Sequence, residues 1–385
     1  MVKVLHTSDW HLGQTFFNYD RLDESRHFLN QLAEIVETEQ PDVMVVSGDV
    51  YNVPSPSASA VKVFTDGMLD VCSRAPQMEV FVTAGNHDSA MRLESDSELW
   101  KHHKVHVVGV VATSVDEIRK YVYVVGNKLV VAAVPFFNPR IIETSEMFSA
   151  IDDEVRRVRT GDMPVVYMAH AAVAGSDVKG HEDGIGGMDF EKVEKFGNEY
   201  DYLALGHIHC PQTIKESGEK ARYCGTPVAV SFDEQYPHGV DIVELERGGV
   251  PNVRTIKIEP LRRMRTIPKA AADFDSAMEE LARLTDDEDC YVRLNVMVND
   301  FLPSDVTYKV AEAVKGKKCR FCYIKRTWQN QTNEPVEVGR FQINELREMD
   351  PVDVACMAWE EINNNKMDDD LLKILKEVVA NERNK

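Results

Sequence analysis

The stretch that decides the fold is Val2–His11, which reads VKVLHTSDWH. An apolar, β-branched run ends there in Asp9 and His11, two residue types that bind metal ions. Further along the chain, four strand-like runs end in similar polar motifs, Gly48-Asp49, Gly85–Asp88 (GNHD), Ala169-His170 and Gly206–His209 (GHIH). Because α/β proteins build their pockets from loops at the carboxyl ends of strands, we expect the five loops to form one site.

The first two thirds of the chain alternate between predicted strands and helices. Helical spacing of apolar residues predicts helices over Asp20–Glu39 and Val61–Cys72. Short runs bounded by turn residues predict further strands at Val43–Ser47, Val80–Ala84, Val105–Val111, Tyr121–Val125, Leu129–Pro135, Val165–Ala169 and Tyr202–Leu205. Antiparallel strands are expected at Arg222–Thr226, Val240–Glu246 and Val253–Ile258. Continuous and alternating strands together predict two packed sheets flanked by helices.

The composition changes at the basic stretch Pro260–Pro268, which we interpret as a linker. It divides the chain into a first domain over residues 1–260 and a smaller α/β domain over residues 269–340. The smaller domain is expected to run helix, strand, helix, strand. Helical patterns then predict a C-terminal tail over residues 341–385.

The charge balance bears on the partners of the chain. With 44 basic and 64 acidic residues the net charge is −20, so the chain as a whole repels phosphates. Two local stretches are basic and are candidates for DNA contact, with Arg263 and Arg265 in the first and Lys317, Lys318, Arg320 and Lys325 in the second. The second stretch also holds aromatic residues, which suits a DNA surface; a solvated strand edge rich in lysine explains it equally well.

The cysteines and the apolar runs indicate the compartment. Seven scattered cysteines, an odd number, predict free thiols in a reducing compartment, and we interpret the CxxC at Cys319–Cys322 as a coincidence. The apolar runs are too short to cross a bilayer, so we expect no membrane association and a cytoplasmic location.

The polar motifs predict a site for two metal ions. Asp9 and His11, two residues apart, point to one face of an extended chain, as do His207 and His209. The Asp49 carboxylate can bridge two ions, while Asn86 and His170 add an amide oxygen and an imidazole. Paired ions about 3.5–4 Å apart are a standard device for hydrolysing phosphoesters. Taken singly, each motif also fits an ordinary turn or helix cap.

Two neighbours of the ligand set have separate predicted roles. His87, adjacent to Asn86, is expected to protonate the leaving oxygen or to stabilise charge. Asp88 is expected to orient His87 or to hold the turn.

The order DxH, GD, GNHD, AH, GHxH resembles that of the calcineurin-like metallophosphoesterases over residues 1–245. The segments His6–Gly13, Ala84–Ser89, Gly206–His209, Arg222–Pro227 and Ser231–Glu234 narrow the resemblance to the SbcD-type, Mre-like repair nuclease subunits. This resemblance implies a four-layer αββα sandwich domain, a smaller α/β capping domain and a helical C-terminal tail.

The resemblance also implies how the ions are held. One ion would be bound by Asp9, His11, Asp49 and His209, and the other by Asp49, Asn86, His170 and His207. Mn²⁺ is the preferred ion, with Mg²⁺, Zn²⁺ and Fe²⁺ as alternatives, and His87 is catalytic. The chain departs from the family at Asn52, where an Asp or His is usual; because Asn is neither acid nor base near neutral pH, exonuclease strength is the property in question.

The implied function is exonuclease and endonuclease cleavage at DNA ends in repair, recombination and replication. Its implied partners are DNA, an SbcC-type coiled-coil ATPase bound by the tail, and a second copy of the chain bound through the helix near Val61–Cys72. Two other functions stay open: a phosphoesterase for small phosphoesters, and a weakly catalytic scaffold that binds DNA ends.

Overall fold

The computed structural model describes residues 1–112, 114–180, 190–285, 287–298 and 305–328, together with single positions between Val352 and Leu375. Contacts divide the chain into one unit over Met1–Trp328 and a second over Gln329–Lys385. Most of the predicted tail lies outside the described residues, although Val352, Cys356, Trp359 and Leu371 are among its helical positions. The predicted domain boundaries near residues 260, 269 and 341 stay predictions.

The first sheet carries the N-terminal strand at its centre, in the order β14-β13-β1-β4-β5-β6. The strands β1, β4, β5 and β6 are parallel to one another, and β13 and β14 are added antiparallel at one edge. Their bounds are β1 Val2–Thr7, β4 Val43–Ser47, β5 Glu79–Thr83, β6 Val105–Val108, β13 Gly239–Leu245 and β14 Asn252–Lys257.

The second sheet has the order β11-β12-β10-β9-β8-β7. Its strands are β7 Val122–Val125, β8 Leu129–Ala133, β9 Val165–His170, β10 Tyr202–Gly206, β11 Gln212–Ile214 and β12 Ala221–Tyr223. The predicted antiparallel strand at Arg222–Thr226 differs from the structure in its bounds and in the direction of its main pairing. It corresponds to β12, which pairs parallel with β10 and antiparallel only with β11, a short strand that the sequence did not predict.

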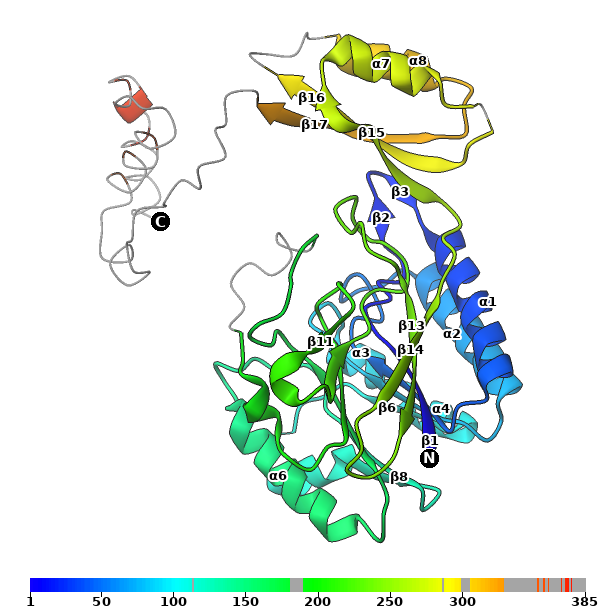
Figure 1. The fold of residues 1–385 in the computed structure, drawn as a ribbon, viewed down its shortest axis with the longest axis vertical. Helices are drawn as coiled ribbons and strands as arrows, with labels where there is room; N and C mark the ends of the chain where they lie inside the picture. Colours follow the sequence, from blue (N-terminus) through cyan, green and yellow to red (C-terminus); the bar gives the residue numbers. More distant parts are fainter. Residues whose placement is uncertain are drawn as a thin grey trace. The chain divides into compact units, whose positions relative to one another are not determined.

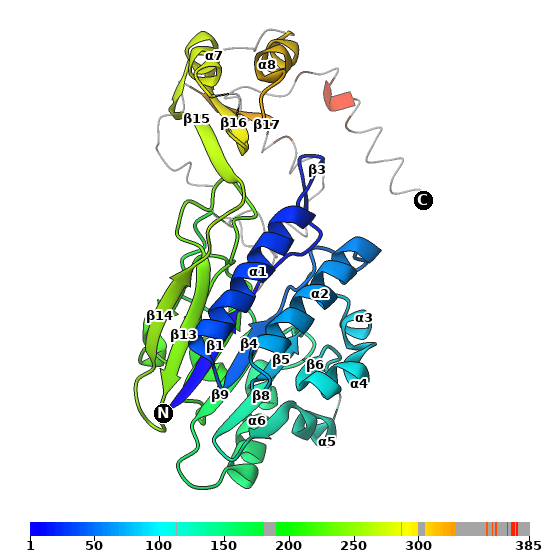
Figure 2. The same ribbon diagram turned by 90° about the vertical axis from the view of Figure 1, so that its right-hand side faces the viewer.

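Helices cover the outer faces of both sheets. The helices α1, Leu22–Glu39, and α2, Ala58–Arg74, lie on one side of the paired sheets, and α6, Thr144–Val158, lies on the other (Figure 1). Figure 2 shows α1 and α2 side by side over β1, β4 and β5. The predicted αββα sandwich is therefore confirmed.

Strand β4 shows why the sequence gives this layering. Val43 and Val45 belong to the core between the two sheets, whereas Met44 and Val46 belong to the core under α1 and α2. All four side chains are fully buried. Because successive residues of a strand point to opposite faces, a strand that is covered on both faces needs an unbroken apolar run.

A third, smaller sheet follows, in the order β15-β16-β17, with all three strands parallel. Its elements are β15 Arg263–Ala272, α7 Phe274–Ala282, β16 Cys290–Val298, α8 Val306–Val314 and β17 Arg320–Trp328. The predicted linker Pro260–Pro268 is wrong over most of its length, because β15 begins at Arg263. This strand pairs with β16 from Arg263 to the buried Ile267 and, after a register shift, again at Ala272. The sequence does not reveal this strand, because the basic residues Arg263, Arg265 and Lys269 interrupt its apolar residues.

The third sheet contacts the two-sheet sandwich through a buried polar and aromatic cluster. Tyr291 of β16 is fully buried, and its hydroxyl donates to Glu24 Oε1 in the first turn of α1 at 2.7 Å. The same carboxylate binds Arg262 Nη1 at 3.0 Å. Phe16 packs edge-on against the Tyr291 ring, with the two centroids 5.2 Å apart. The cluster is thus hydrogen-bonded as well as packed, as buried polar groups require.

This contact predicts a stability effect for Tyr291→Phe. The variant keeps the ring packing but removes a hydrogen bond to a buried carboxylate, so the free energy of unfolding should fall by about 1.5–3 kcal/mol. Urea denaturation measures the change, with Tyr308→Phe as the control because Tyr308 is 69% exposed. Equal stability of the two variants would contradict this account of the cluster.

Candidate metal centre

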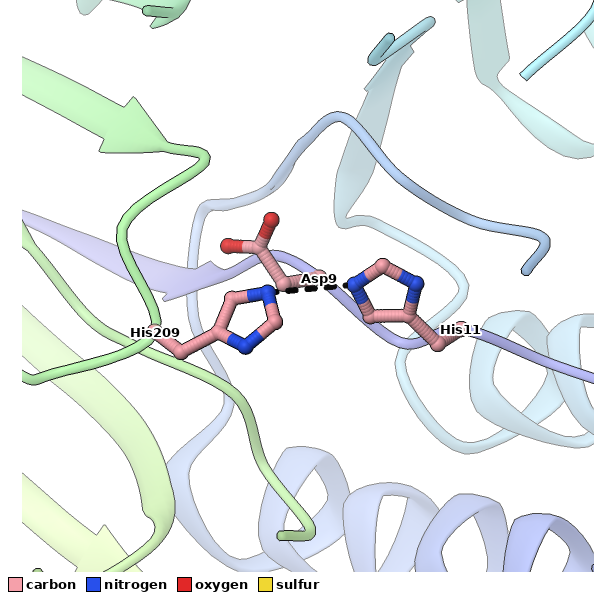
Figure 3. A group of neighbouring side chains, drawn as sticks. All are labelled: Asp9, His11 and His209. Atoms are coloured by element: carbon pink, nitrogen blue, oxygen red, sulfur yellow. Dashed lines mark hydrogen bonds between the residues drawn. The ribbon is translucent and has the colours of Figure 1, made fainter. Parts of the chain in front are cut away.

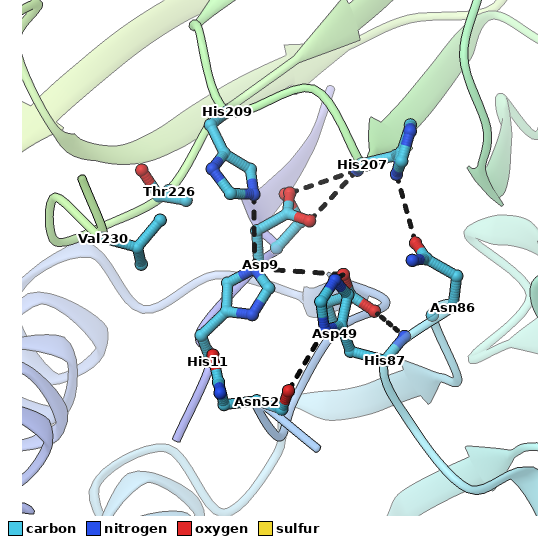
Figure 4. Close-up of polar contacts among 12 residues, drawn as sticks. Asp9, His11, Asp49, Asn52, Asn86, His87, His207, His209, Thr226 and Val230 are labelled. Atoms are coloured by element: carbon cyan, nitrogen blue, oxygen red, sulfur yellow. Dashed lines mark hydrogen bonds and ion pairs between the residues drawn. The ribbon is translucent and has the colours of Figure 1, made fainter. Parts of the chain in front are cut away.

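The polar motifs lie at the carboxyl ends of five parallel strands, three from the first sheet and two from the second. Asp9 and His11 follow β1, Asp49 follows β4, and Asn86 follows β5. His170 is the last residue of β9, and His207 and His209 follow β10. Because both sheets end at the same edge of the sandwich, the side chains that follow β1, β4, β5 and β10 lie together in space (Figure 4). His170 joins them, with Nε2 at 2.9 Å from Asn86 Oδ1.

The backbone at this edge is held in uncommon conformations. Four of the polar residues have positive φ angles: Asp9 (54°), His11 (46°), Asp49 (51°) and His207 (99°). A Cβ atom at Gly85 would overlap with Asp49 Oδ1, so only glycine lets the loop after β5 approach that carboxylate. Left-handed conformations in non-glycine residues cost about 1–3 kcal/mol each and gather at functional sites.

Asp9, His11 and His209 form the first cluster of possible ligand atoms, all within 4.8 Å of one another (Figure 3). The Nε2 atoms of His11 and His209 face each other at 3.2 Å. The three residues are buried, with exposed fractions of 5% or less. A cation between these atoms would be bound by two imidazole nitrogens and a carboxylate, a donor set that suits divalent transition metals.

Asn86, His170 and His207 form the second cluster. Asn86 Oδ1 lies 2.9 Å from His170 Nε2 and 3.1 Å from His207 Nδ1. The backbone N–H of His207 also donates to Asp9 Oδ1, at 3.1 Å, so this cluster adjoins the first.

Asp49 lies between the two clusters. Its Oδ2 atom is 3.8 Å from His11 Nε2 on one side and 3.4 Å from His170 Nε2 on the other. Its Oδ1 atom accepts a hydrogen bond from the backbone N–H of His87 at 2.8 Å. This is the position that a carboxylate shared by two cations would occupy.

Two histidines have one ring nitrogen fixed by an acceptor behind them. His170 Nδ1 donates to the Ser47 carbonyl oxygen at 2.9 Å, and His209 Nδ1 donates to Glu234 Oε1 at 2.7 Å. In both rings Nδ1 therefore carries a proton, and Nε2 is the nitrogen left to bind a cation. This arrangement is typical of metal-bound histidine.

The pKa values of Asp9, Asp49 and His170 depart strongly from their usual values. Burial, assisted by the nearby charge of Asp49, raises the pKa of the Asp9 carboxyl to about 7. Burial opposes ionisation of Asp49 and His170 as well, yet their mutual attraction lowers the pKa of Asp49 and raises the pKa of His170 to about 9. Two buried carboxylates beside four imidazoles fit divalent cations, whose charge would stabilise both carboxylates as anions.

The His87 ring contacts the main chain of Asn52, and the sequence did not predict this contact. His87 Nδ1 donates to the main-chain carbonyl oxygen of Asn52 at 3.1 Å. His87 Nε2 lies 4.0 Å from Asp49 Oδ2, and 43% of the side chain is exposed. The ring therefore borders the cluster and also reaches solvent, and its orientation rests on the backbone at position 52.

Asp88 holds two loops together. Its carboxylate accepts hydrogen bonds from the backbone N–H groups of Val50, Tyr51 and Gly85, at 2.9–3.0 Å. Of the two roles considered for Asp88, these contacts favour holding the turn.

Sequence reasoning missed two supporting residues, Glu234 and Ser8. Glu234 lies in the loop segment before β13, where no periodic pattern marks a buried side chain. Ser8 Oγ donates to Asp9 Oδ2 at 2.5 Å. Both act on predicted ligands through contacts that only the folded chain reveals.

The basic residues considered for DNA contact lie in β15, before β17 and in β17. Most of them bind oxygen atoms of the protein. Arg320 pairs with Asp289, Arg265 with Glu288, Lys318 with Asp287 at 3.3 Å, and Lys325 with Asp233 at 3.6 Å. Lys317 Nζ donates to the Ala282 carbonyl oxygen at 3.2 Å, and Arg263 is exposed. Their positive charge is thus partly offset, and their role in binding DNA stays a prediction.

A pocket adjoins the cluster at His170. Its lining includes the aromatic rings of Phe136, Phe137 and Phe196, together with the side chains of Arg140 and Glu191. The Phe136 ring lies edge-on to the His170 ring, 6.1 Å between centroids. Among the described residues, no helix has the length and hydropathy needed to span a membrane.

Comparison with known proteins agrees with this geometry. The family described as calcineurin-like phosphoesterase matches residues 2–211, and the family described as type 5 capsule protein repressor C-terminal domain matches residues 260–363.

Curated relatives match most of the chain. The SbcD subunit of nuclease SbcCD from Bacillus subtilis (strain 168) is 30% identical, over 89% of this chain and 91% of its own length. The proteins of the same name from Rhodobacter capsulatus and Escherichia coli K12 are 29% and 25% identical, over 74% and 95% of this chain and 76% and 95% of their own lengths. The chain therefore belongs to the calcineurin-like phosphoesterase family and, within it, to the group of SbcD subunits of nuclease SbcCD. It is a hydrolase, and its cluster of Asp and His side chains is suited to divalent metal ions.

The position of Asp49 predicts the effect of Asp49→Asn. The substitution keeps the shape but removes the charge between the two clusters. Affinity for divalent metal should therefore fall by more than the about 10–100-fold that is typical of losing a partner behind a ligand. Equilibrium dialysis with metal analysis measures the number of bound ions and their affinity. Asp66→Asn, on the exposed face of α2, is the matched control. Two ions bound as tightly as in the wild type would contradict a shared role for Asp49.

Proposed function

We propose that this chain is a Mn²⁺-dependent DNA nuclease that hydrolyses phosphodiester bonds at DNA ends, as an exonuclease and an endonuclease, in DNA repair and recombination. The observation that carries the proposal is the Asp49 carboxylate between two clusters of ligand atoms. Two adjacent cation sites are the arrangement that phosphodiester hydrolysis uses.

We assign one ion to Asp9, His11, Asp49 and His209, and the other to Asp49, Asn86, His170 and His207. The fixed Nδ1 protons of His170 and His209 support this assignment, because each leaves Nε2 as the ligand atom. A mixed set of nitrogen and oxygen donors suits Mn²⁺, with Mg²⁺, Zn²⁺ and Fe²⁺ as the alternatives.

When bound, the two ions would lower the pKa of water and withdraw charge from the phosphoryl oxygens. Proton delivery and the positioning of the loops depend on residues of the chain. His87, held through Nδ1 by the Asn52 carbonyl, is half exposed at the edge of the cluster and can deliver a proton from Nε2 to the leaving oxygen. Asp88 acts indirectly, by fixing the loops that carry Asp49 and His87.

The neighbouring pocket favours a nucleic-acid substrate over a small phosphoester. Phe136 and Phe137 line a hollow directly beside His170, within reach of a nucleotide whose phosphate lies at the cluster. Aromatic side chains stack on bases, and this adds about 1–3 kcal/mol per base. A small phosphoester would leave the pocket unused.

The complete set of predicted ligands and His87 favours catalysis over a scaffold role. We keep Arg263, Arg265, Lys317, Lys318, Arg320 and Lys325 as proposed DNA contacts. Since most of them bind acidic or carbonyl oxygens, phosphates would have to replace those partners.

The proposed partners follow from the relatives, whose name describes one component of an SbcCD nuclease. We propose that this chain acts with an SbcC-type ATPase and pairs with a second copy through α2, where Leu69 is exposed. All seven cysteines are free thiols, which suits a cytoplasmic location. We also propose that residues 1–260, 269–340 and 341–385 serve as nuclease, capping and partner-docking segments.

The proposed function is tested with two substrates. Purified protein with Mn²⁺ is incubated with end-labelled linear duplex and single-stranded DNA, and separately with bis-p-nitrophenyl phosphate. We expect cleavage of both DNA forms and of the small ester. Hydrolysis of the ester without DNA cleavage, even with the ATPase present, would favour the small-phosphoester function, and no hydrolysis at all would favour the scaffold.

His87→Ala tests the role of the proton donor. Because His87 is not assigned to either ion, the variant should bind two ions as the wild type does, while turnover of bis-p-nitrophenyl phosphate falls about 10²–10⁴-fold. Metal titration and initial rates measure the two quantities, with His103→Ala, at an exposed position, as the control. Loss of an ion from the variant would mean that His87 is a ligand instead.

A further inference from the structure

The loop segment of residues 229–234 connects the candidate metal centre with the third sheet. At its end, the Glu234 carboxylate is buried, and both of its oxygens are used. Oε1 accepts from His209 Nδ1 at 2.7 Å, while Oε2 accepts from the Val230 N–H at 3.0 Å and from Thr226 Oγ1 at 3.2 Å. These hydrogen bonds hold the carboxylate in one orientation, and the bond from Nδ1 in turn fixes the orientation of the His209 ring.

The residues next to Glu234 are bound from the third sheet. Arg293 of β16, with an exposed fraction of only 2%, pairs with Asp233 at 2.8 Å. Its guanidinium carbon lies 5.2 Å from the centroid of the Phe232 ring, and Nη2 lies 3.5 Å from the Phe232 carbonyl oxygen. Lys325 of β17 approaches the same Asp233 carboxylate at 3.6 Å. Two strands of the small sheet thus bind consecutive residues of one loop.

The start of the segment is bound from the other side. Arg21, immediately before α1, donates to the Ala229 carbonyl oxygen at 2.9 Å. Gln14 donates to the Val230 carbonyl oxygen at 3.1 Å. Gln14 also donates its backbone N–H to the carbonyl oxygen of His11 at 3.2 Å, so the segment is fixed against the loop that carries two of the proposed ligands.

We propose that Glu234 is a positioning residue for His209, and that the Asp233–Arg293 pair links this proposed ligand to the third sheet. The ion held by Asp9, His11, Asp49 and His209 then binds at full affinity only while β16 contacts the segment. The inference deepens the proposed function, because it rests on the assignment of His209 as a ligand. A partner that alters the contact between β16 and the segment would thereby alter one ion site and leave the other unchanged.

Loss of the Glu234 contact should weaken metal binding because a loosely held ligand must be ordered when the ion binds. A carboxylate behind a metal-bound imidazole fixes its tautomer, orients its ring and raises its basicity, and removing such a partner typically lowers metal affinity 10–100-fold. His170 has a carbonyl oxygen in this place, supplied by Ser47 inside the sandwich. The His209 side of the centre thus receives its support from a segment bound by the small sheet, and the His170 side receives it from the sandwich itself.

The first test is Mn²⁺ titration of Glu234→Gln, followed by the electron paramagnetic resonance signal of free Mn²⁺. We expect one of the two ions to bind about 10–100-fold more weakly, while the second binds as in the wild type. Glu79→Gln is the matched control, because Glu79 pairs with His106 at 2.9 Å far from the centre. Unchanged binding of both ions, or equal weakening of both, would overturn the positioning role. Thermal unfolding of the metal-free variants separates this selective loss from general destabilisation.

The second test is Asp233→Asn, which is tolerated by the fold because 46% of the Asp233 side chain is exposed. Removal of the ion pair should weaken the same ion about two- to fivefold, the range of a partly exposed pair. Glu288→Gln is its control, since it breaks the Arg265–Glu288 pair inside the small domain without touching the segment. Asp233→Asn with the metal affinity of the control would overturn the link to the third sheet.

These measurements are independent of DNA cleavage. If the wild type cleaves no DNA but Glu234→Gln loses one ion selectively, the proposed function fails and the positioning role holds. If the wild type cleaves DNA and both variants bind two ions normally, the inference fails and the proposed function holds.

Discussion

The contact on which the structure depends is the approach of Asp49 to two histidines that come from opposite sheets. His11 follows a strand of the first sheet, and His170 ends a strand of the second, yet both Nε2 atoms lie within 4 Å of the same carboxylate oxygen. The two sheets bring them together because they pack face to face and because β1, β4 and β9 end at the same edge. Without a cation, burying two carboxylates and four imidazoles together is unfavourable, since each buried charge needs a compensating partner. The packing of the sandwich therefore holds these side chains together although their burial is unfavourable, and bound cations would make that burial favourable.

The fold supplies this arrangement at a local cost in backbone energy. Left-handed φ angles at Asp9, His11 and Asp49 turn the chain sharply at the strand ends, and Gly85 admits the close approach of the loop after β5. Asp88 then fixes that loop to the loop after β4 through three backbone hydrogen bonds. The apolar strands buried behind these loops provide the stability that offsets the strain. Defined positions for the ligand atoms are thus set before any ion binds, which lowers the cost of ordering the site on binding.

The sequence predicted the sandwich and the residues that converge on its edge, because both depend on strong local signals. Buried strands need apolar runs, and a polar motif directly after such a run marks a strand end. The strand β15 was missed because its basic residues resemble a linker, although Ile267 is buried. The ion pairs of the basic stretch were also missed: Asp289 precedes β16 and Arg320 begins β17, so parallel pairing brings residues far apart in sequence together. Glu234 lies in a segment that carries the family resemblance, but no role was predicted for it, since its contact with His209 is known only from the folded chain. The roles of the converging residues stay predictions.

Position 52 shows how a departure from a family pattern can be compatible with the same geometry. The side chain there is Asn, where the family usually has Asp or His, and an amide cannot exchange protons near neutral pH. In this structure, however, the hydrogen bond to His87 is made by the main-chain carbonyl oxygen of Asn52, which every residue type provides. The backbone at this point is itself fixed, because the Asn52 N–H donates to the Leu12 carbonyl oxygen at 3.1 Å. Orientation of the His87 ring is therefore independent of the side chain at position 52, and any effect of Asn52 on cleavage must act through charge or through direct contact with the substrate.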